Sequence, residues 1–204
     1  MKTFSRIAIT TLSMMGMATV ASAQQKAPAA AGKAAPPKAA PAPKAADKAP
    51  MMMPAPAEIA AMAKQLGGTW RCKGEEWDDK GARGALTATT TGKLDLNGWW
   101  LTEVMEAKGR MTFRMVMHTT YDPTSKKWRR LAIMNDGGQM IGTSEGMKDN
   151  KMTWNLDVMG PMGAGLVRDH LDMTDTKAGM KAWGEVSMDK GKTWLKMYEM
   201  TCKK

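Results

Sequence analysis

The chain has 204 residues and a formal net charge of +10, with 30 basic and 20 acidic side chains and only two cysteines. The charge is unevenly placed, because the first 56 residues carry +6 of it and the remaining 148 residues carry only +4. A nucleic-acid-binding domain concentrates basic residues on its folded part, since neutralising phosphates drives its affinity. Nucleic acid is therefore excluded as a partner.

Residues 1–23 have the pattern of a bacterial export signal. Two basic residues stand in the first six, residues 7–20 form an apolar run, and an Ala-Ser-Ala cleavage site ends at Ala23. The apolar run is shorter than the roughly 20 residues that a membrane-spanning helix needs. We therefore expect cleavage after Ala23, a periplasmic or secreted mature protein, and no transmembrane segment.

Residues 24–56 are almost entirely Ala, Pro, Lys, Gly and Met. Such a segment has too little large apolar surface to offset the entropy cost of folding, so we expect a disordered tether. Its prolines favour an extended conformation of about 3.1 Å per residue. Its lysines suit weak contact with anionic polymers of the cell envelope, and a solubilising spacer is the alternative interpretation.

Residues 57–204 form a single predicted domain. Residues 57–66 have helical composition, with prolines before them and two glycines after them. Beyond that point the apolar pattern changes to period two, which is typical of half-buried strands separated by Gly-, Asp- and Asn-rich turns. About ten strands are expected, near residues 69–77, 84–94, 97–106, 111–121, 127–135, 138–145, 151–158, 165–173, 178–188 and 192–202.

The order of these strands predicts a closed barrel. Short turns imply an up-and-down meander, and an even number of strands makes the first and last antiparallel, so that they can pair. Cys72 and Cys202 fall in those two strands, and an oxidising compartment favours a disulfide between them. Two buried unpaired thiols are the alternative. The fold class is therefore all-β, a monomeric antiparallel barrel with a short N-terminal helix.

Methionine is unusually frequent, with 23 residues in the chain. Thioethers outside the cytoplasm can bind Cu(I), and Met115, Met117 and His118 lie close together in the sequence. On a strand, however, His118 points to the opposite face from both methionines. With only two phenylalanines present, the methionines are interpreted mainly as flexible core filler. Copper binding and an oxidant-absorbing role are less favoured alternatives, and we predict no metal site and no cofactor.

Residues that could support catalysis are few. His118 and His170 are the only histidines, and neither lies in a spaced metal-binding or catalytic motif. A barrel enzyme could use His118, His170 or an internal carboxylate such as Glu103. The chain is therefore predicted to be non-enzymatic, with a barrel isomerase or hydrolase as an alternative.

Three local patterns carry further expectations. Residues 160–165 are rich in glycine and predict a mobile loop that could gate a cavity. Residues 187–194 match the Asp-box pattern S-x-D-x-G-x-T-W, and a single copy predicts a structural hairpin. Trp99 and Trp100 are adjacent in a predicted strand, so one of them should face the lumen.

Several short motifs follow one another in an order typical of one family. They are Leu-Gly-Gly-Thr-Trp at 66–70, Leu-Asn-Gly-Trp-Trp-Leu at 96–101, Tyr-Asp-Pro at 121–123 with Lys-Lys-Trp at 126–128, Gly-Thr-Ser-Glu-Gly at 142–146 and Met-Tyr-Glu-Met at 197–200. Together they resemble the bacterial domain of unknown function 1579 family over residues 66–204. The resemblance implies a calycin-like barrel, similar in outline to lipocalins and fatty-acid-binding proteins, and it implies no established activity and no catalytic residues.

A barrel of this size can hold one small molecule in its lumen. The leading hypothesis is therefore a barrel that binds a small hydrophobic or amphipathic ligand, enclosed beneath the Gly-rich loop or the helix. The candidate lumen residues are Trp99, Phe113, Met115, Met117, Met134, Met152 and Trp154. The alternative is a non-catalytic structural or interaction protein of the cell envelope, with a filled barrel.

Overall fold

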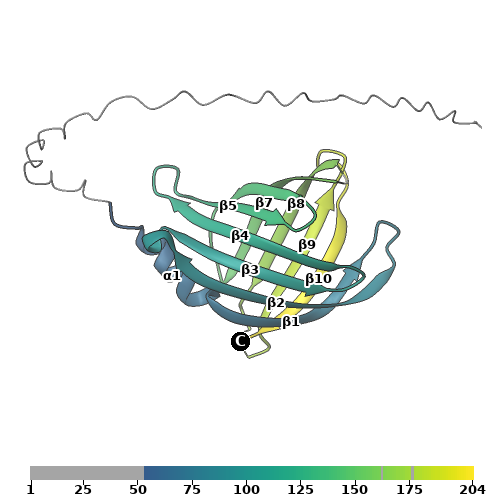
Figure 1. The fold of residues 1–204 in the computed structure, drawn as a ribbon, viewed down its shortest axis with the longest axis horizontal. Helices are drawn as coiled ribbons and strands as arrows, with labels where there is room; N and C mark the ends of the chain where they lie inside the picture. Colours follow the sequence, from purple (N-terminus) through teal and green to yellow (C-terminus); the bar gives the residue numbers. More distant parts are fainter. Residues whose placement is uncertain (1–52, 162, 176) are drawn as a thin grey trace, which may run out of the picture. The chain divides into compact units, whose positions relative to one another are not determined.

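The computed structural model describes residues 53–161, 163–175 and 177–204, and these form one antiparallel β-barrel with one α-helix (Figure 1). The predicted signal and almost all of the predicted tether lie outside the described residues. The elements are α1 (Ala57–Leu66), β1 (Gly68–Trp77), β2 (Arg83–Asp95), η1 (Leu96–Gly98), β3 (Trp100–Lys108), β4 (Thr112–Asp122), β5 (Lys127–Met134), β6 (Gln139–Ser144), β7 (Lys151–Gly160), β8 (Gly163–Asp172), β9 (Met180–Ser187) and β10 (Leu195–Lys203). Within the described part of the chain, no helix is long and apolar enough to span a membrane.

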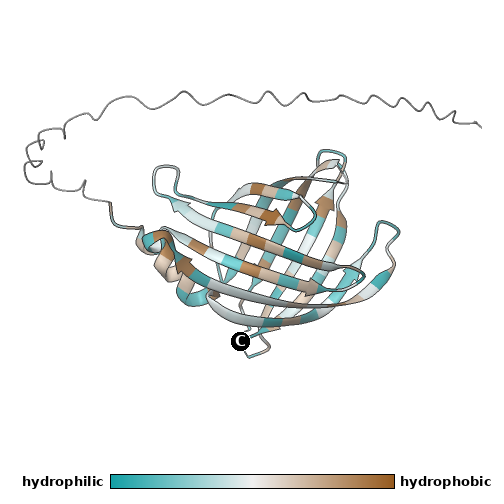
Figure 2. Ribbon diagram, in the orientation of Figure 1, coloured by the Kyte–Doolittle hydropathy of each residue, from teal (hydrophilic) through white to brown (hydrophobic). Residues whose placement is uncertain are grey.

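Every strand pairs antiparallel with its neighbours in the sequence, and β1 also pairs with β10. The predicted closed up-and-down barrel of ten strands with a short N-terminal helix is therefore confirmed. Figure 2 shows apolar and polar residues alternating along the strands, as the pleat of a sheet with one buried face requires.

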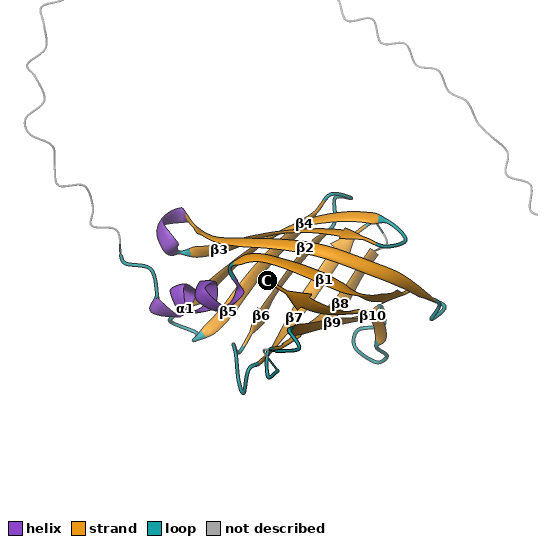
Figure 3. Ribbon diagram, turned by 90° about the horizontal axis from the view of Figure 1, so that it is seen from below, coloured by secondary structure: helices purple, strands orange, loops and turns teal. Residues whose placement is uncertain are grey.

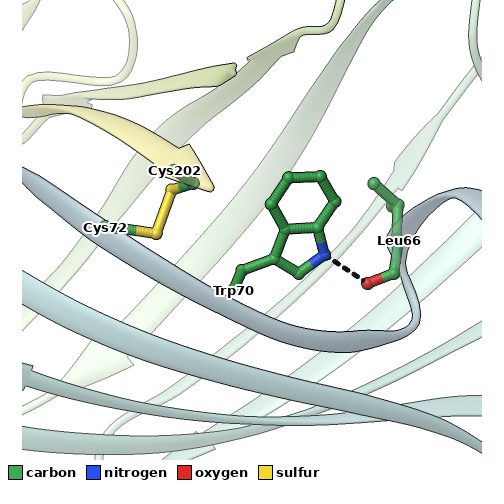
Figure 4. Close-up of a disulfide and its surroundings, with 4 residues drawn as sticks. All are labelled: Leu66, Trp70, Cys72 and Cys202. Carbon is green, nitrogen blue, oxygen red and sulfur yellow. Dashed lines mark hydrogen bonds between the residues drawn. A yellow bond between two sulfur atoms is a disulfide. The ribbon is translucent and has the colours of Figure 1, made fainter. Parts of the chain in front are cut away.

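The disulfide joins the two strands that close the barrel (Figure 4). Cys72 on β1 lies directly opposite Cys202 on β10, and their sulfur atoms are 2.03 Å apart. Both residues are buried. Beside them, the Trp70 indole N–H donates to the carbonyl of Leu66 at 2.8 Å, which ties the end of α1 to β1. The predicted pairing of the cysteines is confirmed.

Helix α1 covers one end of the lumen. Ile59, Met62 and Leu66 lie on one stripe of the helix and are buried in the largest core cluster of the barrel. Pro56 precedes the helix, and the Gly67 N–H donates to the Ala63 carbonyl at its end. The predicted bounds of the helix are confirmed. We call this the capped end of the barrel.

The opposite end is formed by five hairpin connections, β1–β2, β3–β4, β5–β6, β7–β8 and β9–β10. Figure 3 shows α1 and η1 together at the capped end, away from these hairpins. In the described part of the chain, no helix covers this second end, which we call the open end.

Two predicted strand starts are wrong, and in each case a turn is longer than expected. The third strand begins at Trp100 rather than at residue 97, because Leu96 and Asn97 adopt positive φ in η1, with the Asp95 carboxylate accepting from the Leu96 N–H. The last strand begins at Leu195 rather than at residue 192, because the Asp-box turn extends to its tryptophan.

The Asp-box forms a hairpin turn between β9 and β10, as predicted. One oxygen of Asp189 accepts from the backbone N–H groups of Lys192 and Thr193, and the Trp194 indole N–H donates to the Gly191 carbonyl. Hydrogen bonds from the Thr193 hydroxyl and backbone and from the Ser187 hydroxyl lower the pKa of Asp189 to about 2. The motif is thus accounted for as a turn.

The predicted Gly-rich connection at 160–165 lies at one end of the barrel, as expected, but its predicted length is wrong. Strand β7 continues to Gly160, β8 begins at Gly163, and these two glycines face each other in the ladder. Because glycine adapts to a tight connection, the segment forms a short hairpin instead of a loop across the lumen.

Candidate functional site

Most of the predicted lumen residues are brought together inside the barrel, in two groups. Four of them pack in one cluster on β4 and β5, and two lie on β7 in the cluster that contacts α1. The first group is Phe113, Met115, Met117 and Met134, and the second is Met152 and Trp154.

The tryptophan doublet is placed differently from the prediction. Trp99 lies before β3, and its indole N–H donates to the Met53 carbonyl at 3.3 Å. Trp100 meets His118 edge-on, with ring centroids 6.3 Å apart, and His118 alternates with the inward-facing methionines of β4. Neither tryptophan packs in the lumen clusters, so the expectation that one of them faces the lumen is wrong. Alternation applies only within a strand, and β3 begins between the two residues, at Trp100.

A cluster of polar side chains lies in the middle of the lumen, around Arg130 of β5. Its guanidinium is 3.6 Å from a carboxylate oxygen of Glu103 and 3.4 Å from one of Asp169. It also donates through Nε to the Thr119 hydroxyl at 3.2 Å. Only 5% of the Arg130 side chain is exposed. We call Glu103, Thr119, Arg130, Asp169 and Tyr198 the polar cluster.

Strand register explains how Arg130 reaches so many partners. Thr119 lies directly opposite Arg130 on β4, while the residue opposite it on β6 is Gly142. A glycine there leaves no side chain between Arg130 and β7. The guanidinium therefore lies over the ring of Trp154, with its carbon 4.0 Å from the ring centroid. A cation held over an aromatic face gains about 0.5–2 kcal/mol, with the higher values at desolvated sites.

Tyr198 completes the cluster from β10. Gly184 of β9 lies directly opposite both Tyr198 and Asp169, so the three occupy one row across β10, β9 and β8. The Tyr198 hydroxyl donates to the Asp169 carboxylate. A Cβ at position 184 would lie 2.4 Å from the Tyr198 ring. Glycine at this position therefore leaves room for the ring to lie across β9 towards Asp169.

The polar cluster holds two carboxyl groups for one guanidinium. Burial raises the pKa of Glu103, an effect that Arg130 partly opposes and Asp169 reinforces. Burial likewise raises the pKa of Asp169, against the Arg130 charge and the Tyr198 hydrogen bond. Burial and the neighbouring Asp169 raise the pKa of Tyr198 well above its ordinary value, so its hydroxyl remains a donor.

Two buried polar atoms at this site have no hydrogen-bond partner among the described residues. They are Oε2 of Glu103 and Nε1 of Trp154. Each belongs to a side chain that contacts Arg130, the first at 3.6 Å and the second through its ring. Buried polar groups in native proteins are nearly always hydrogen-bonded, and an unmet one costs about 1–3 kcal/mol. Such groups can be met by a water, an ion or a ligand in the lumen.

Glu103→Gln is expected to raise the thermal midpoint at neutral pH. The folded state holds the Glu103 proton at pH values where the unfolded chain, with a pKa of 4.5, has released it. The unfolding free energy of the wild type therefore falls as pH rises above that value, and the variant escapes this loss. Thermal unfolding at several pH values between 4 and 8 measures the difference, which should grow with pH.

The control for this variant is Glu106→Gln on the same strand. The Glu106 side chain is 65% exposed and pairs with Arg114 at 3.5 Å, so its replacement should change stability by no more than about 0.5 kcal/mol. A loss of stability in Glu103→Gln that is equal at all pH values would contradict the burial of an uncompensated carboxyl.

The two histidines do not contribute to the lumen. His118 contacts the Thr102 hydroxyl through Nδ1 at 3.2 Å. His170 contacts the Thr153 hydroxyl at 2.9 Å and stacks on Trp183. Both lie on the faces of their strands that alternate with the buried residues. Of the residues proposed for a barrel enzyme, only Glu103 lies in the polar cluster.

Two other features could mark a functional site: a group of metal ligands or a surface cavity. In the described ranges, no three His, Cys, Asp or Glu side chains are close enough to hold a metal ion. One surface cavity of about 390 Å³ lies between α1 and β2, and another of about 380 Å³ lies beside β5 and β6. We place the candidate site in the lumen, because the buried charges and the unpartnered polar atoms lie there.

Comparisons with known proteins bear on the fold alone. No family model matches the chain, and no curated protein matches it either. Among solved structures, the S-type phycobiliprotein lyase CPES from Guillardia theta is similar, with 10% sequence identity and a TM-score of 0.46. That match covers 71% of this chain and 90% of the lyase chain.

Proposed function

We propose that the barrel binds a small amphipathic molecule in its lumen, with the polar group of that molecule at the polar cluster. The observation that carries the proposal is the pair of buried atoms without partners, Glu103 Oε2 and Trp154 Nε1. They offer one carboxyl oxygen and one N–H donor. The complementary ligand group both donates and accepts hydrogen bonds, as a primary amide does.

The open end supplies a route to this site. Phe113, Met134 and Met140 belong to the lumen cluster near this end, and they are half-buried rather than buried. Deeper in the barrel, 18% of the Asp169 side chain is exposed. Methionine side chains adapt to ligands of different shape, which suits an apolar body lying along this wall.

A purely hydrophobic ligand fits the site less well than an amphipathic one. It would leave the hydrogen-bonding groups of Glu103 and Trp154 unmet, whereas an amphipathic ligand would gain about 1–3 kcal/mol for each group that it meets. The sequence-based hypothesis of a hydrophobic or amphipathic ligand is thereby narrowed to the second class. We therefore propose an amphipathic ligand.

The first test is native mass spectrometry of protein purified from its own cell envelope, with a denatured sample as reference. A retained non-covalent mass supports the proposal and identifies the ligand class. The second test is calorimetric titration with dodecane and lauramide, two probes with twelve-carbon chains that differ in the polar group. We expect lauramide to bind about tenfold or more tightly than dodecane, equivalent to about 1.4 kcal/mol.

Trp154→Phe is the variant that tests the orientation of the ligand. It removes the N–H donor and keeps an aromatic face for Arg130, so lauramide should bind about tenfold more weakly while dodecane is unaffected. Trp183→Phe is the matched control, because that ring stacks on His170 outside the lumen. Failure of both probes to bind, together with a bare polypeptide in native mass spectrometry, would favour a structural barrel with a filled lumen.

Export and family membership are further parts of the proposal. The disulfide between Cys72 and Cys202 supports a working place outside the cytoplasm, where such bonds persist. The signal pattern of residues 1–23 supports the same assignment, in the periplasm or beyond it. The order of the sequence motifs supports membership of the domain of unknown function 1579 family.

A further inference from the structure

Five methionines line one side of the lumen towards the open end. Met105 of β3 lies directly opposite Met115 of β4, and Met115 lies directly opposite Met134 of β5. Met117 and Met140 pack in the same cluster, from β4 and β6. Five positions on four strands thus bring together thioethers that the sequence scatters over 36 residues, from Met105 to Met140.

The geometry of the three aligned methionines allows their sulfur atoms to converge. Directly opposite residues of antiparallel strands have Cβ atoms about 4.5–5.5 Å apart. A methionine side chain is unbranched and has three rotatable bonds, so the outer two can lean towards Met115. The wall of a closed barrel is concave on its inner face, which shortens the distances further.

The surroundings of the row formed by Met105, Met115 and Met134 favour a soft cation. The apolar side chains packed around it are methionines, Phe113 and Ala132. Glu103, directly opposite Met117 on β3, already pairs with Arg130 at 3.6 Å, so the copper ligands that we propose are thioethers alone. Met105 and Met134 are half-buried, which leaves the row accessible from the open end.

Core filling alone does not account for this gathering. The core at the capped end is built mainly from branched aliphatic and aromatic residues, including Leu101, Leu156 and Val167. These have better-defined rotamers than methionine and pack more uniquely. Methionine also occurs in that core, but in the cluster at the accessible end it makes up five of the seven residues, three of them in register on adjacent strands.

We propose that the thioether sulfurs of Met105, Met115 and Met134 bind one Cu(I) ion at the open end of the lumen. Thioethers are soft ligands that select Cu(I) over harder divalent ions. The copper remains monovalent throughout, so no oxidant or reductant takes part in binding. The set differs from the sequence-based candidate of Met115, Met117 and His118, which strand alternation separates onto opposite faces.

The test is titration of the full chain with Ag(I), a stable monovalent soft probe, and anaerobically with Cu(I) in competition with a chromophoric chelator. We expect one metal ion per barrel, sulfur neighbours in X-ray absorption spectra, and no comparable binding of Zn²⁺. Met105→Leu/Met115→Leu/Met134→Leu should weaken binding by at least tenfold. Each substitution nearly conserves volume and costs less than about 1.5 kcal/mol, and Met115→Leu alone serves if the triple variant does not fold.

Two controls separate this site from the other methionines. Met159→Leu/Met188→Leu changes exposed methionines outside the cluster and should leave binding unchanged. Leucine replacement of Met51, Met52 and Met53 tests the segment before α1 in the same way. Absence of Ag(I) and Cu(I) binding, or equal binding by the triple variant and the wild type, would overturn the proposal. Because Trp154→Phe leaves these sulfurs untouched, failure of the lumen-ligand proposal is distinguishable from failure of this one.

Discussion

Replacement of Arg130 by methionine is expected to lower the free energy of unfolding by about 3–5 kcal/mol at neutral pH, one of the two largest effects we anticipate for this barrel. The guanidinium lies within 4 Å of the carboxylates of both Glu103 and Asp169. Methionine fills much of the same volume, so the loss comes chiefly from two buried carboxyls left without a cation. Urea denaturation followed by circular dichroism measures it.

The pH dependence of this loss identifies its cause. As pH falls, the carboxyls of Glu103 and Asp169 take up protons in the folded variant, so the difference between variant and wild type should shrink. Both groups have a raised pKa even beside Arg130, and removing the cation raises the pKa of each further. A difference that is independent of pH would point to lost packing instead of uncompensated charge.

Two further variants complete the comparison. Arg129→Met on the same strand removes an exposed pair with Asp122 and should cost no more than about 1 kcal/mol. Glu103→Gln and Asp169→Asn, added to Arg130→Met, remove all the charges together and should restore most of the lost stability. Failure of this rescue would show that Arg130 acts mainly by filling space.

The barrel itself could be predicted from the sequence because its signals are local. Period-two alternation and turn residues locate strands without knowledge of their partners, and short turns imply that neighbours in sequence pair in space. Closure followed from an even strand number and from the positions of Cys72 and Cys202. The errors at residues 97 and 192 arise where a turn is longer than its pattern indicates, as in η1 and the Asp-box.

The polar cluster could not be predicted in the same way, because it depends on register across six strands. Asp169 stands in a run of charged residues with Arg168 and Asp172 that gives no sign of an inward-facing carboxyl, yet it faces the lumen beside Trp154. The inward face of strand β5 is also hard to predict from the sequence. Its outer face carries Leu131 and Ile133, which are 36% and 48% exposed, while Arg130 faces inward. Hydropathy alone would assign these faces the other way round.

The copper proposal depends on register in the same manner. Alternation along β4 correctly separates His118 from Met115 and Met117. It gives no information on Met105 or Met134, which reach the same row only through the pairing of β3, β4 and β5. Sequence reasoning therefore named thioethers as candidate copper ligands but did not find the set that we propose.

A buried charge cluster at mid-lumen destabilises a barrel, because unpaired and desolvated groups cost free energy that packing must offset. Closure of the seam between β1 and β10 is one source of that offset. The seam contains six register pairs from Arg71 to Glu76 on β1, and one of them is covalent.

Replacement of both Cys72 and Cys202 by alanine is expected to lower the free energy of unfolding by about 2–5 kcal/mol. The bond closes a loop with a sequence separation of 130, so most of its effect lies in restricting the unfolded chain. The five other pairs of the seam keep β1 and β10 together, so the folded barrel should retain its strand pairing. Urea denaturation of the variant, and of the wild type with and without reductant, measures the loss.

The native state supplies the decisive control for this prediction. If the bond acts through the unfolded chain, the folded variant should bind lauramide and Ag(I) as the wild type does, and only the unfolding midpoint should move. An unchanged midpoint would show that the bond is dispensable for stability. Loss of binding together with a loss well above 5 kcal/mol would show instead that the seam opens without it, and that the lumen depends on the covalent closure of β1 onto β10.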